Sequence, residues 1–313
     1  MRKRALGKTG LQVSELALGT WGLSGDAYGP VVETEVDRVI DRALAVGVTL
    51  FDTADAYGRG EMERRLGKRL QGAGTTYVVT KIGTDLETSP PVKRFDPQHL
   101  WTAFERSQER LGRDVVDGVL LHNPPIKALR SPEPTAFLKD LKKQGKIRFW
   151  GVSAGSADVA RSAIREEADV VELAYNVFLS GDLHEVAGDV SESGAGVLAR
   201  SVLAHGLLAG QWSAEREFYP GDHRAERWTA SELRTRVRQL DALRPLVSGA
   251  VVSVRAAALR FVLSNQLVSS AVLGPRSVNQ LEQLVREAGM PPYLRDTALA
   301  ELSVRLKKLG VVV

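Results

Sequence analysis

Four residues whose types suit proton transfer lie at the ends of three apolar, β-rich segments of this 313-residue chain. Asp52 and Tyr57 belong to one such segment, Lys81 lies near the end of the next, and His122 closes a third. If neighbouring parallel strands carry these segments, the four side chains emerge at the carboxyl ends of the strands and converge on one pocket. The spacing therefore predicts a shared site.

The four residue types together suit proton delivery to a carbonyl oxygen. A phenol with a pKa of roughly 10 acts as an acid near neutral pH only if a neighbour lowers that pKa or draws the proton away. An adjacent ammonium does this, a carboxylate keeps the ammonium charged in a dry pocket, and an imidazole holds the substrate oxygen. Taken singly, such residues are more often structural groups, so the prediction rests on their joint placement.

The elements that position these residues alternate along the whole chain between short apolar strands and segments of helical periodicity. Strands are expected at 16–21, 49–54, 77–82, 115–122, 147–153, 170–176, 196–202 and 269–274, and helical patterns at 36–44, 97–111, 136–144, 253–264 and 278–288. Eight such units predict a (β/α)8 TIM barrel formed as a single domain over residues 1–313. A doubly wound sheet is the alternative, but no Gly-x-Gly-x-x-Gly turn follows the first strand.

Three further segments complete the expected architecture. The pairs 3–6 and 11–14 flank a Gly-Lys-Thr-Gly turn, which predicts a β-hairpin that plugs the amino end of the barrel. A long loop after the seventh strand, about 203–250, contains four aromatic residues, which argue against disorder and for a functional excursion. Leucines at helical spacing after Pro292 predict a last helix on the outside.

The bulk composition limits the possible functions. The absence of cysteine excludes a disulfide framework, thiolate metal ligands and cysteine nucleophiles. The 42 basic and 38 acidic residues are interspersed, so nucleic-acid binding is the weaker interpretation of the net charge of +4. With neither a signal peptide nor a membrane span visible, we expect a cytoplasmic protein with no membrane or nucleic-acid partner. The oligomeric state stays open.

Several motifs along the chain share one resemblance. They are Leu6-Gly-Lys-Thr-Gly-Leu-Gln-Val-Ser14, Leu18-Gly-Thr-Trp21, Phe51-Asp-Thr-Ala-Asp-Ala-Tyr-Gly58, Thr80-Lys-Ile-Gly83, Leu121-His-Asn-Pro124, Gly151-Val-Ser153, Gly206-Leu-Leu-Ala-Gly210 and Gly274-Pro-Arg-Ser277. On these residues the chain resembles an aldo-keto reductase over nearly its whole length. The resemblance implies a barrel that binds an extended NADPH or NADP⁺ across its carboxyl face, with Tyr57 as general acid/base, Asp52 and Lys81 tuning it, and His122 orienting the carbonyl.

The same resemblance implies the residues that bind the cofactor and the substrate. Those expected near the nicotinamide are Gly19, Thr20, Trp21, Asp52, Ser153 and Glu172. Those expected under the ring and around the pyrophosphate are Arg200, Ser201, Leu203, His205 and Gly206. Those expected at the adenosine phosphate are Gly274, Arg276, Ser277, Gln280 and Gln283. The substrate pocket is expected to contain Trp21, Tyr57, His122, Asn123 and the 203–250 excursion, and no metal site is expected.

Two of these cofactor positions have consequences of their own. Arg276 precedes a helix N-terminus and has no evident core role, so we expect it to bind the 2′-phosphate that distinguishes NADPH from NADH. Glu172 stands where the family usually has glutamine. A carboxylate beside the nicotinamide favours the oxidised cofactor, unless the carboxylate is protonated or pairs with Arg200 and has no net field at the ring.

The chain also departs from the family pattern elsewhere. Ala154 replaces an asparagine, Arg200 stands where some relatives stack a tyrosine on the ring, and Gln283-Leu284 replaces the Glu-Asn pair that commonly reads adenine. Because the four proton-transfer residues are all present, these changes affect the expected cofactor affinity more than the expected catalysis.

Three functions are compatible with this sequence to different degrees. The leading hypothesis is an NADPH-dependent oxidoreductase that reduces an aldehyde or ketone, or oxidises an alcohol. The second is an NADPH-binding regulatory or redox-sensing subunit with little turnover. A metal-dependent hydrolase is set aside, because only His122 and His205 of the five histidines lie near predicted strand ends.

Overall fold

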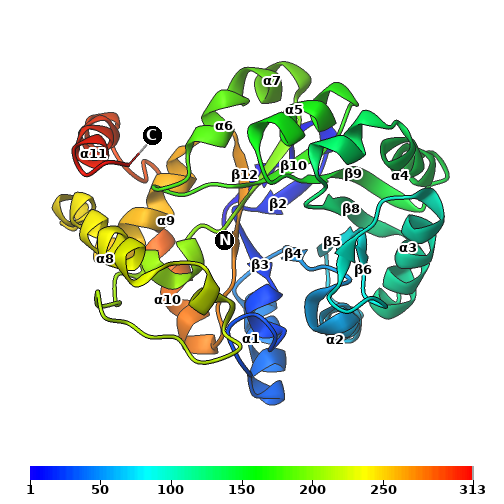
Figure 1. Ribbon diagram of the computed structural model, residues 1–313, viewed down its shortest axis with the longest axis horizontal. Helices are drawn as coiled ribbons and strands as arrows, with labels where there is room; N and C mark the ends of the chain where they lie inside the picture. Colours follow the sequence, from blue (N-terminus) through cyan, green and yellow to red (C-terminus); the bar gives the residue numbers. More distant parts are fainter. Residues whose placement is uncertain (312–313) are drawn as a thin grey trace.

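Eight parallel strands close into a barrel, and helices surround it (Figure 1). The computed structural model describes residues 1–311. Strand order around the barrel follows the chain and returns to its start: β3 (Leu16–Gly19), β4 (Leu50–Asp52), β5 (Tyr77–Ile82), β8 (Val116–His122), β9 (Ile147–Ser153), β10 (Val170–Ala174), β11 (Gly196–Arg200) and β12 (Val268–Leu273). The predicted (β/α)8 barrel is confirmed.

Helices separate the strands and form the outer layer of the molecule (Figure 1). They are α1 (Glu33–Ala45), α2 (Glu61–Arg69), α3 (Pro97–Leu111), α4 (Glu133–Lys143), α5 (Ala157–Arg165), α6 (Gly181–Glu185), α7 (Ala187–Ser193), α8 (Ala230–Gln239), α9 (Val254–Ser264), α10 (Val278–Ala288) and α11 (Asp296–Lys308). Periodicity predicted α1, α3, α4, α9, α10 and α11. It missed α2 and α5 to α8, which are ten residues or shorter and show too few turns for a clear pattern.

The amino end of the barrel is closed by a hairpin, as predicted. Strands β1 (Lys3–Ala5) and β2 (Gln12–Ser14) pair antiparallel, and their chain start lies near the centre of the ribbon view (Figure 1). Leu6 and Val13 are fully buried and pack against residues from all eight barrel strands. The floor of the barrel is therefore a dry apolar plug.

The excursion between β11 and α9 is folded rather than extended. It contains short 3-10 turns and α8, which begins with a capping box between Thr229 and Glu232. Its aromatic residues join a second apolar cluster, in which Trp212 packs against Phe218 and Trp228 at ring distances of 5.2 and 5.8 Å. Helix α11 packs on the same cluster, so the predicted outer helix is confirmed (Figure 1).

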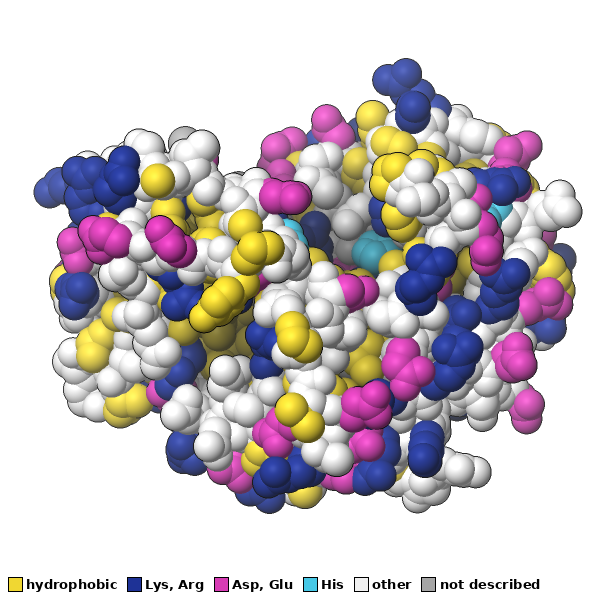
Figure 2. Space-filling model, turned by 60° about the horizontal axis from the view of Figure 1, so that its bottom comes forward, with side chains coloured by type: hydrophobic (Ala, Val, Ile, Leu, Met, Phe, Trp, Pro, Cys, Tyr) yellow, Lys and Arg dark blue, Asp and Glu magenta, His cyan; other side chains and the backbone are white. Residues whose placement is uncertain are grey.

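The described surface is mixed in character. Acidic and basic side chains are interspersed over the face drawn in Figure 2, which is hollowed toward its upper part. Within residues 1–311, no helix combines the length and the apolarity that a membrane crossing requires. Among the same residues, no cluster of histidine and carboxylate side chains has the arrangement of a metal site.

A short two-stranded sheet lies outside the barrel in the segment that follows β5. Strands β6 (Thr84–Asp85) and β7 (Val92–Lys93) pair antiparallel. The Lys93 ammonium donates to the Thr84 hydroxyl at 2.9 Å and adds positive charge near the His122 ring. No strands were predicted here, because each strand is only two residues long and too short to show an alternating pattern.

Candidate active site

The barrel interior is built in two layers of inward-facing side chains. The lower layer is apolar, with Ala17, Leu50, Val79, Leu120, Phe149, Val170, Leu198 and Val272 packed on the hairpin. Because side chains alternate along a strand, the residues two positions later also face inward. These are Gly19, Asp52, Lys81, His122, Gly151, Glu172, Arg200 and Gly274. The lower layer of the barrel interior is therefore apolar, and the layer two residues further along each strand, at the carboxyl ends, contains several charged side chains.

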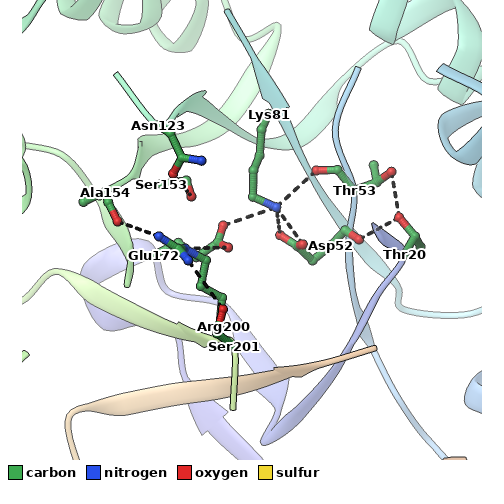
Figure 3. A network of polar contacts seen from close by, with 10 residues as sticks. All are labelled: Thr20, Asp52, Thr53, Lys81, Asn123, Ser153, Ala154, Glu172, Arg200 and Ser201. Atoms are coloured by element: carbon green, nitrogen blue, oxygen red, sulfur yellow. Dashed lines mark hydrogen bonds and ion pairs between the residues drawn. The ribbon is translucent and has the colours of Figure 1, made fainter. Parts of the chain in front are cut away.

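Lys81 lies at the centre of this charged layer (Figure 3). Its Nζ atom donates to both carboxylate oxygens of Asp52, at 2.6 and 2.5 Å, and to the Thr53 carbonyl at 3.3 Å. Both charged side chains are almost fully buried. Neighbouring strands β4 and β5 carry the two residues, so strand pairing fixes the ion pair.

Tyr57 and His122 complete the predicted group. The Lys81 ammonium lies 5.4 Å from the centre of the Tyr57 ring, and the His122 ring meets the Tyr57 ring edge to face at 5.8 Å. The buried His122 Nδ1 atom has no hydrogen-bond partner within the described structure. The structure thus brings all four predicted residues together around one point.

The pKa shifts follow from burial and charge. Burial raises the pKa of Tyr57 above its usual value, and Lys81 only partly opposes this. The expectation of a lowered tyrosine pKa is therefore wrong for the ligand-free protein: desolvation outweighs the ammonium. Burial also lowers the pKa of His122 well below 6.5, with Lys93 acting in the same direction, so its imidazole is neutral.

The charged layer contains a second carboxylate, which comes from β10. Glu172 Oε2 lies 3.3 Å from Lys81 Nζ, and Glu172 Oε1 lies 3.9 Å from Arg200 Nε. Arg200 in turn donates to the Ala154 carbonyl at 3.0 Å (Figure 3). Glu172 thus lies between two cations, one of which, the Lys81 ammonium, is also bound by Asp52.

These residues face one large cavity of about 1030 Å³. Most predicted site residues line it: Gly19, Trp21, Asp52, Tyr57, His122, Asn123, Ser153, Glu172, Arg200, Ser201, Leu203, His205, Gly206, Gly274, Arg276, Gln280 and Gln283. Three do not. Lys81 lies behind Asp52, the Thr20 hydroxyl bonds to the Asp52 carbonyl at 3.1 Å, and Ser277 caps α10 by accepting the Gln280 amide.

Arg276 has a structural role that the sequence did not reveal. Its guanidinium donates to the carbonyls of Tyr28, Gly29 and Pro30 at 2.8 to 2.9 Å. The premise that this side chain has no packing role is therefore wrong: it ties the loop after β3 to the start of α10. Its position at the cavity wall agrees with the prediction.

The loop after β3 and the excursion meet over the cavity. The His223 amide donates to the Ala27 carbonyl at 3.0 Å, and the Arg224 guanidinium lies 4.6 Å above the Tyr28 ring. The Tyr28 hydroxyl pairs with His205 Nδ1 at 3.0 Å. Sequence reasoning missed Tyr28 and Arg224, because the contact joins two loops that have no periodic pattern.

Six arginines line the cavity, against three carboxylate residues: Arg200, Arg216, Arg224, Arg227, Arg255 and Arg276, against Asp26, Asp52 and Glu172. Arg224 and Arg255 are paired with Asp222 and Glu287. Within residues 1–311, Arg216 and Arg227 have no carboxylate at ion-pair distance and contact aromatic rings instead. A cavity with uncompensated guanidinium groups suits an anionic ligand.

The backbone around the cavity is locally strained. Asn123, Ser201 and His205 line the cavity with φ angles of 49°, 56° and 59°, a region that residues other than glycine rarely adopt. Such strain clusters where a site needs side chains in fixed positions. Asn123 and Ser201 directly follow β8 and β11, so the strained positions begin where regular strand pairing ends.

Comparisons with known proteins agree with this geometry. Residues 15–292 match the model of the aldo/keto reductase family. The aldo-keto reductase YhdN of Bacillus subtilis (strain 168) is 29% identical over 300 residues, covering 92% of this chain and 89% of that protein. The NADH-specific methylglyoxal reductase of Escherichia coli (strain K12) is 28% identical over 307 residues, covering 91% and 93%.

A solved structure is similar over the whole barrel. The glycerol dehydrogenase AKR11B4 from Gluconobacter oxydans superposes with a TM-score of 0.85 at 26% identity, covering 99% of this chain and 97% of that one. The closed parallel barrel, the buried Lys81–Asp52 pair beside Tyr57 and the match over residues 15–292 all lead to the same assignment. This chain belongs to the aldo/keto reductase family.

Proposed function

We propose that this protein is an NADPH-dependent oxidoreductase that reduces an aldehyde or ketone, or oxidises the corresponding alcohol. The observation that carries the proposal is the group of Asp52, Tyr57 and His122 at one wall of the cavity, with Lys81 directly behind Asp52.

Tyr57 is the proposed proton donor. The phenol is protonated at neutral pH, and because burial raises its pKa, the site has to stabilise the phenolate as the proton leaves. As the proton leaves, the phenolate gains the attraction of the Lys81 ammonium, whose charge is secured because nearby carboxylates outweigh burial and raise its pKa. The pair is therefore arranged to stabilise charge that develops only during the reaction.

His122 is proposed to orient the substrate. A neutral imidazole carries one N–H that donates to a carbonyl oxygen, and burial keeps the His122 ring in this form. The ring meets Tyr57 at 5.8 Å, so both groups reach the same oxygen. A bound nicotinamide would supply or accept the hydride in the same cavity.

The phosphate groups of such a cofactor would fit the arginine-rich wall. The NADPH preference is part of our proposal and rests on the excess of cavity arginines, above all on Arg216 and Arg227, which have no carboxylate partner in the described chain. An NADH-specific relative exists, so both cofactors belong in the test.

The substrate class is proposed from the wall that faces Tyr57. Trp21, His122 and Asn123 offer one large aromatic surface and a few polar groups, which suits small carbonyl compounds and polyols. Relatives named as acting on methylglyoxal and glycerol lie within this class.

The deciding experiment measures turnover and binding together. Purified protein is mixed with NADPH or NADH and a panel of small aldehydes, ketones and polyols, and nicotinamide absorbance is followed in both directions. We expect turnover with NADPH and at least one carbonyl compound. Tight NADPH binding without turnover on any panel member would instead favour the cofactor-binding regulatory subunit.

A further inference from the structure

Two carboxylates share one buried ammonium at this site. Asp52 contacts Lys81 Nζ through both oxygens, and Glu172 Oε2 approaches the same nitrogen to 3.3 Å from the opposite side (Figure 3). Glu172 is 2% exposed, and within residues 1–311 its Oε2 atom accepts no hydrogen bond. A single ammonium therefore faces two acids inside a dry pocket.

This arrangement is electrostatically unbalanced. One carboxylate neutralises Lys81, and a second buried negative charge near the first is costly because water cannot screen the repulsion. Arg200 offsets part of it, but its Nε atom lies 3.9 Å from Glu172 and its side chain is 28% exposed. A proton taken from solvent through the cavity removes the imbalance.

We propose that Glu172 is a positioning residue of the proton-transfer group: Glu172 and Asp52 hold Lys81 between them and share one proton, which they exchange with solvent through the cavity. The proposal rests on the proposed function for its effect on turnover, but the shared proton exists without it. The proton belongs to the pair as a coupled unit and not to either carboxyl alone.

The pKa of Asp52 supports this inference. Burial and the Glu172 carboxylate raise it from 3.8 to about 7, while Lys81 and Arg200 lower it. Charged or titratable groups that face the pair come from four other elements: Lys81 on β5, Arg200 on β11, Tyr57 after β4 and His122 on β8. Lys93 on β7 acts on His122, and the β9 neighbour of Glu172, Ser153, is uncharged.

The shared proton sets the strength of Tyr57 as an acid. When the pair holds the proton, Lys81 is less compensated and stabilises the Tyr57 phenolate more strongly. When the pair loses the proton, the extra negative charge opposes phenolate formation. Carbonyl reduction should therefore slow as pH rises through the neutral range, by about fivefold to tenfold for one buried charge at this distance.

Infrared difference spectroscopy of the cofactor-free protein tests the proton directly. In the wild type, the carbonyl band of a protonated carboxylic acid should disappear between about pH 5 and about pH 9. In Glu172→Gln this component should be absent, because Asp52 alone beside Lys81 is ionised throughout. Asp55 is another buried acid with a pKa of about 7. Its carbonyl band contributes equally to the spectra of the wild type and of Glu172→Gln, so it cancels when the two are compared.

The pH profile of carbonyl reduction provides the second arm. Glu172→Gln should lose the neutral inflection of kcat/KM, whereas Arg200→Gln should move it to higher pH, because a cation that favours the ionised pair is gone. The control is Glu63→Gln, which removes another fully buried carboxylate, one that pairs with Arg110 at 2.7 Å. It should alter stability without moving the inflection.

The two arms separate this inference from the proposed function. An infrared titration that is unchanged in Glu172→Gln overturns the shared proton, whatever the turnover. If the wild type has no turnover at all, the function fails while the infrared result still decides on the proton. If Glu172→Gln does not fold, an inflection that stays in place in Arg200→Gln overturns the inference.

Discussion

The two layers of the barrel interior differ in what each strand contributes over a step of two residues. The lower layer is entirely apolar and packs on Leu6 and Val13, whereas the upper layer carries Asp52, Lys81, His122, Glu172 and Arg200. The same backbone positions both, so geometry alone does not distinguish them. The difference indicates that the lower layer mainly stabilises the barrel and the upper layer carries the reactive side chains. We therefore expect that each layer can be altered separately.

The largest effect is expected from a substitution that creates a cavity in the lower layer. Phe149→Ala removes a fully buried ring and should lower the free energy of unfolding by about 3–5 kcal/mol. The protein that stays folded should keep its turnover within a few-fold. Urea unfolding measures the loss, and Tyr219→Ala, at a side chain that is 86% exposed, is the control. A loss below about 1 kcal/mol would show that the lower layer is not the structural level.

Removing the acid in the upper layer should have the opposite signature. Tyr57→Phe should lower kcat by about 10²-fold or more, the scale of a positioned acid, and leave unfolding and NADPH binding close to the wild type. Lys81→Met should cause a comparable loss, since the phenolate loses its cation. Steady-state kinetics measures the loss of kcat, and Tyr77→Phe is the matched control. Near-wild-type turnover in Tyr57→Phe would assign the proton to another group.

Arg276 lies at the edge of the upper layer and tests where cofactor discrimination resides. Arg276→Ala should weaken NADPH binding by about 1.5–3 kcal/mol, the range for a charge-assisted hydrogen bond, and weaken NADH binding less. Fluorescence titration with both cofactors measures this, and Arg286→Ala on the exposed face of α10 is the control. Equal losses would mean that Arg276 only holds the loop at 28–30.

A last effect concerns how the free energy of unfolding depends on pH. Burial and the Glu63 carboxylate raise the pKa of Asp55 to about 7, against 3.8 for the unfolded chain. The folded state therefore retains a proton that the unfolded chain has released. The contribution of Asp55 to the free energy of unfolding is thus fully present below about pH 4 and is lost as pH rises to about 7. A shift of about three pKa units corresponds to about 4 kcal/mol at most, and Asp55→Asn should remove most of this loss.

Thermal unfolding across that pH interval measures the effect. Asp158→Asn, at a carboxylate that is 78% exposed, should leave the slope as it is in the wild type. A slope that is equally steep in Asp55→Asn would place the responsible proton elsewhere, with the Asp52 and Glu172 pair as the next group to examine.

Much of this architecture was predictable because it repeats locally. Apolar strand segments and the period of α1, α3 and α10 are visible in any short window, and eight repeats leave few folds to choose from. The predicted strand bounds agree with the observed ones to within two residues. Short helices such as α2 and the two-residue strand β6 left no such signal.

The candidate site divides in the same way. That Asp52, Tyr57, Lys81 and His122 lie close together followed from their places at strand ends, because parallel strands present those ends on one face. The direction of the Tyr57 pKa did not follow, since it depends on how completely the ring is buried. Nor did the role of Arg276, whose partners lie about 250 residues earlier in the chain.

The sequence by itself therefore determined the repeating elements, the barrel and the placement of Asp52, Tyr57, Lys81 and His122 at neighbouring strand ends, because local periodicity and strand-end position encode them. Only the tertiary structure decided that Glu172 lies against Lys81, since β5 and β10 are distant in the chain and meet only across the closed barrel. The electrostatic balance of the site depends on such distances and on burial, and neither exists until the strands close around one interior.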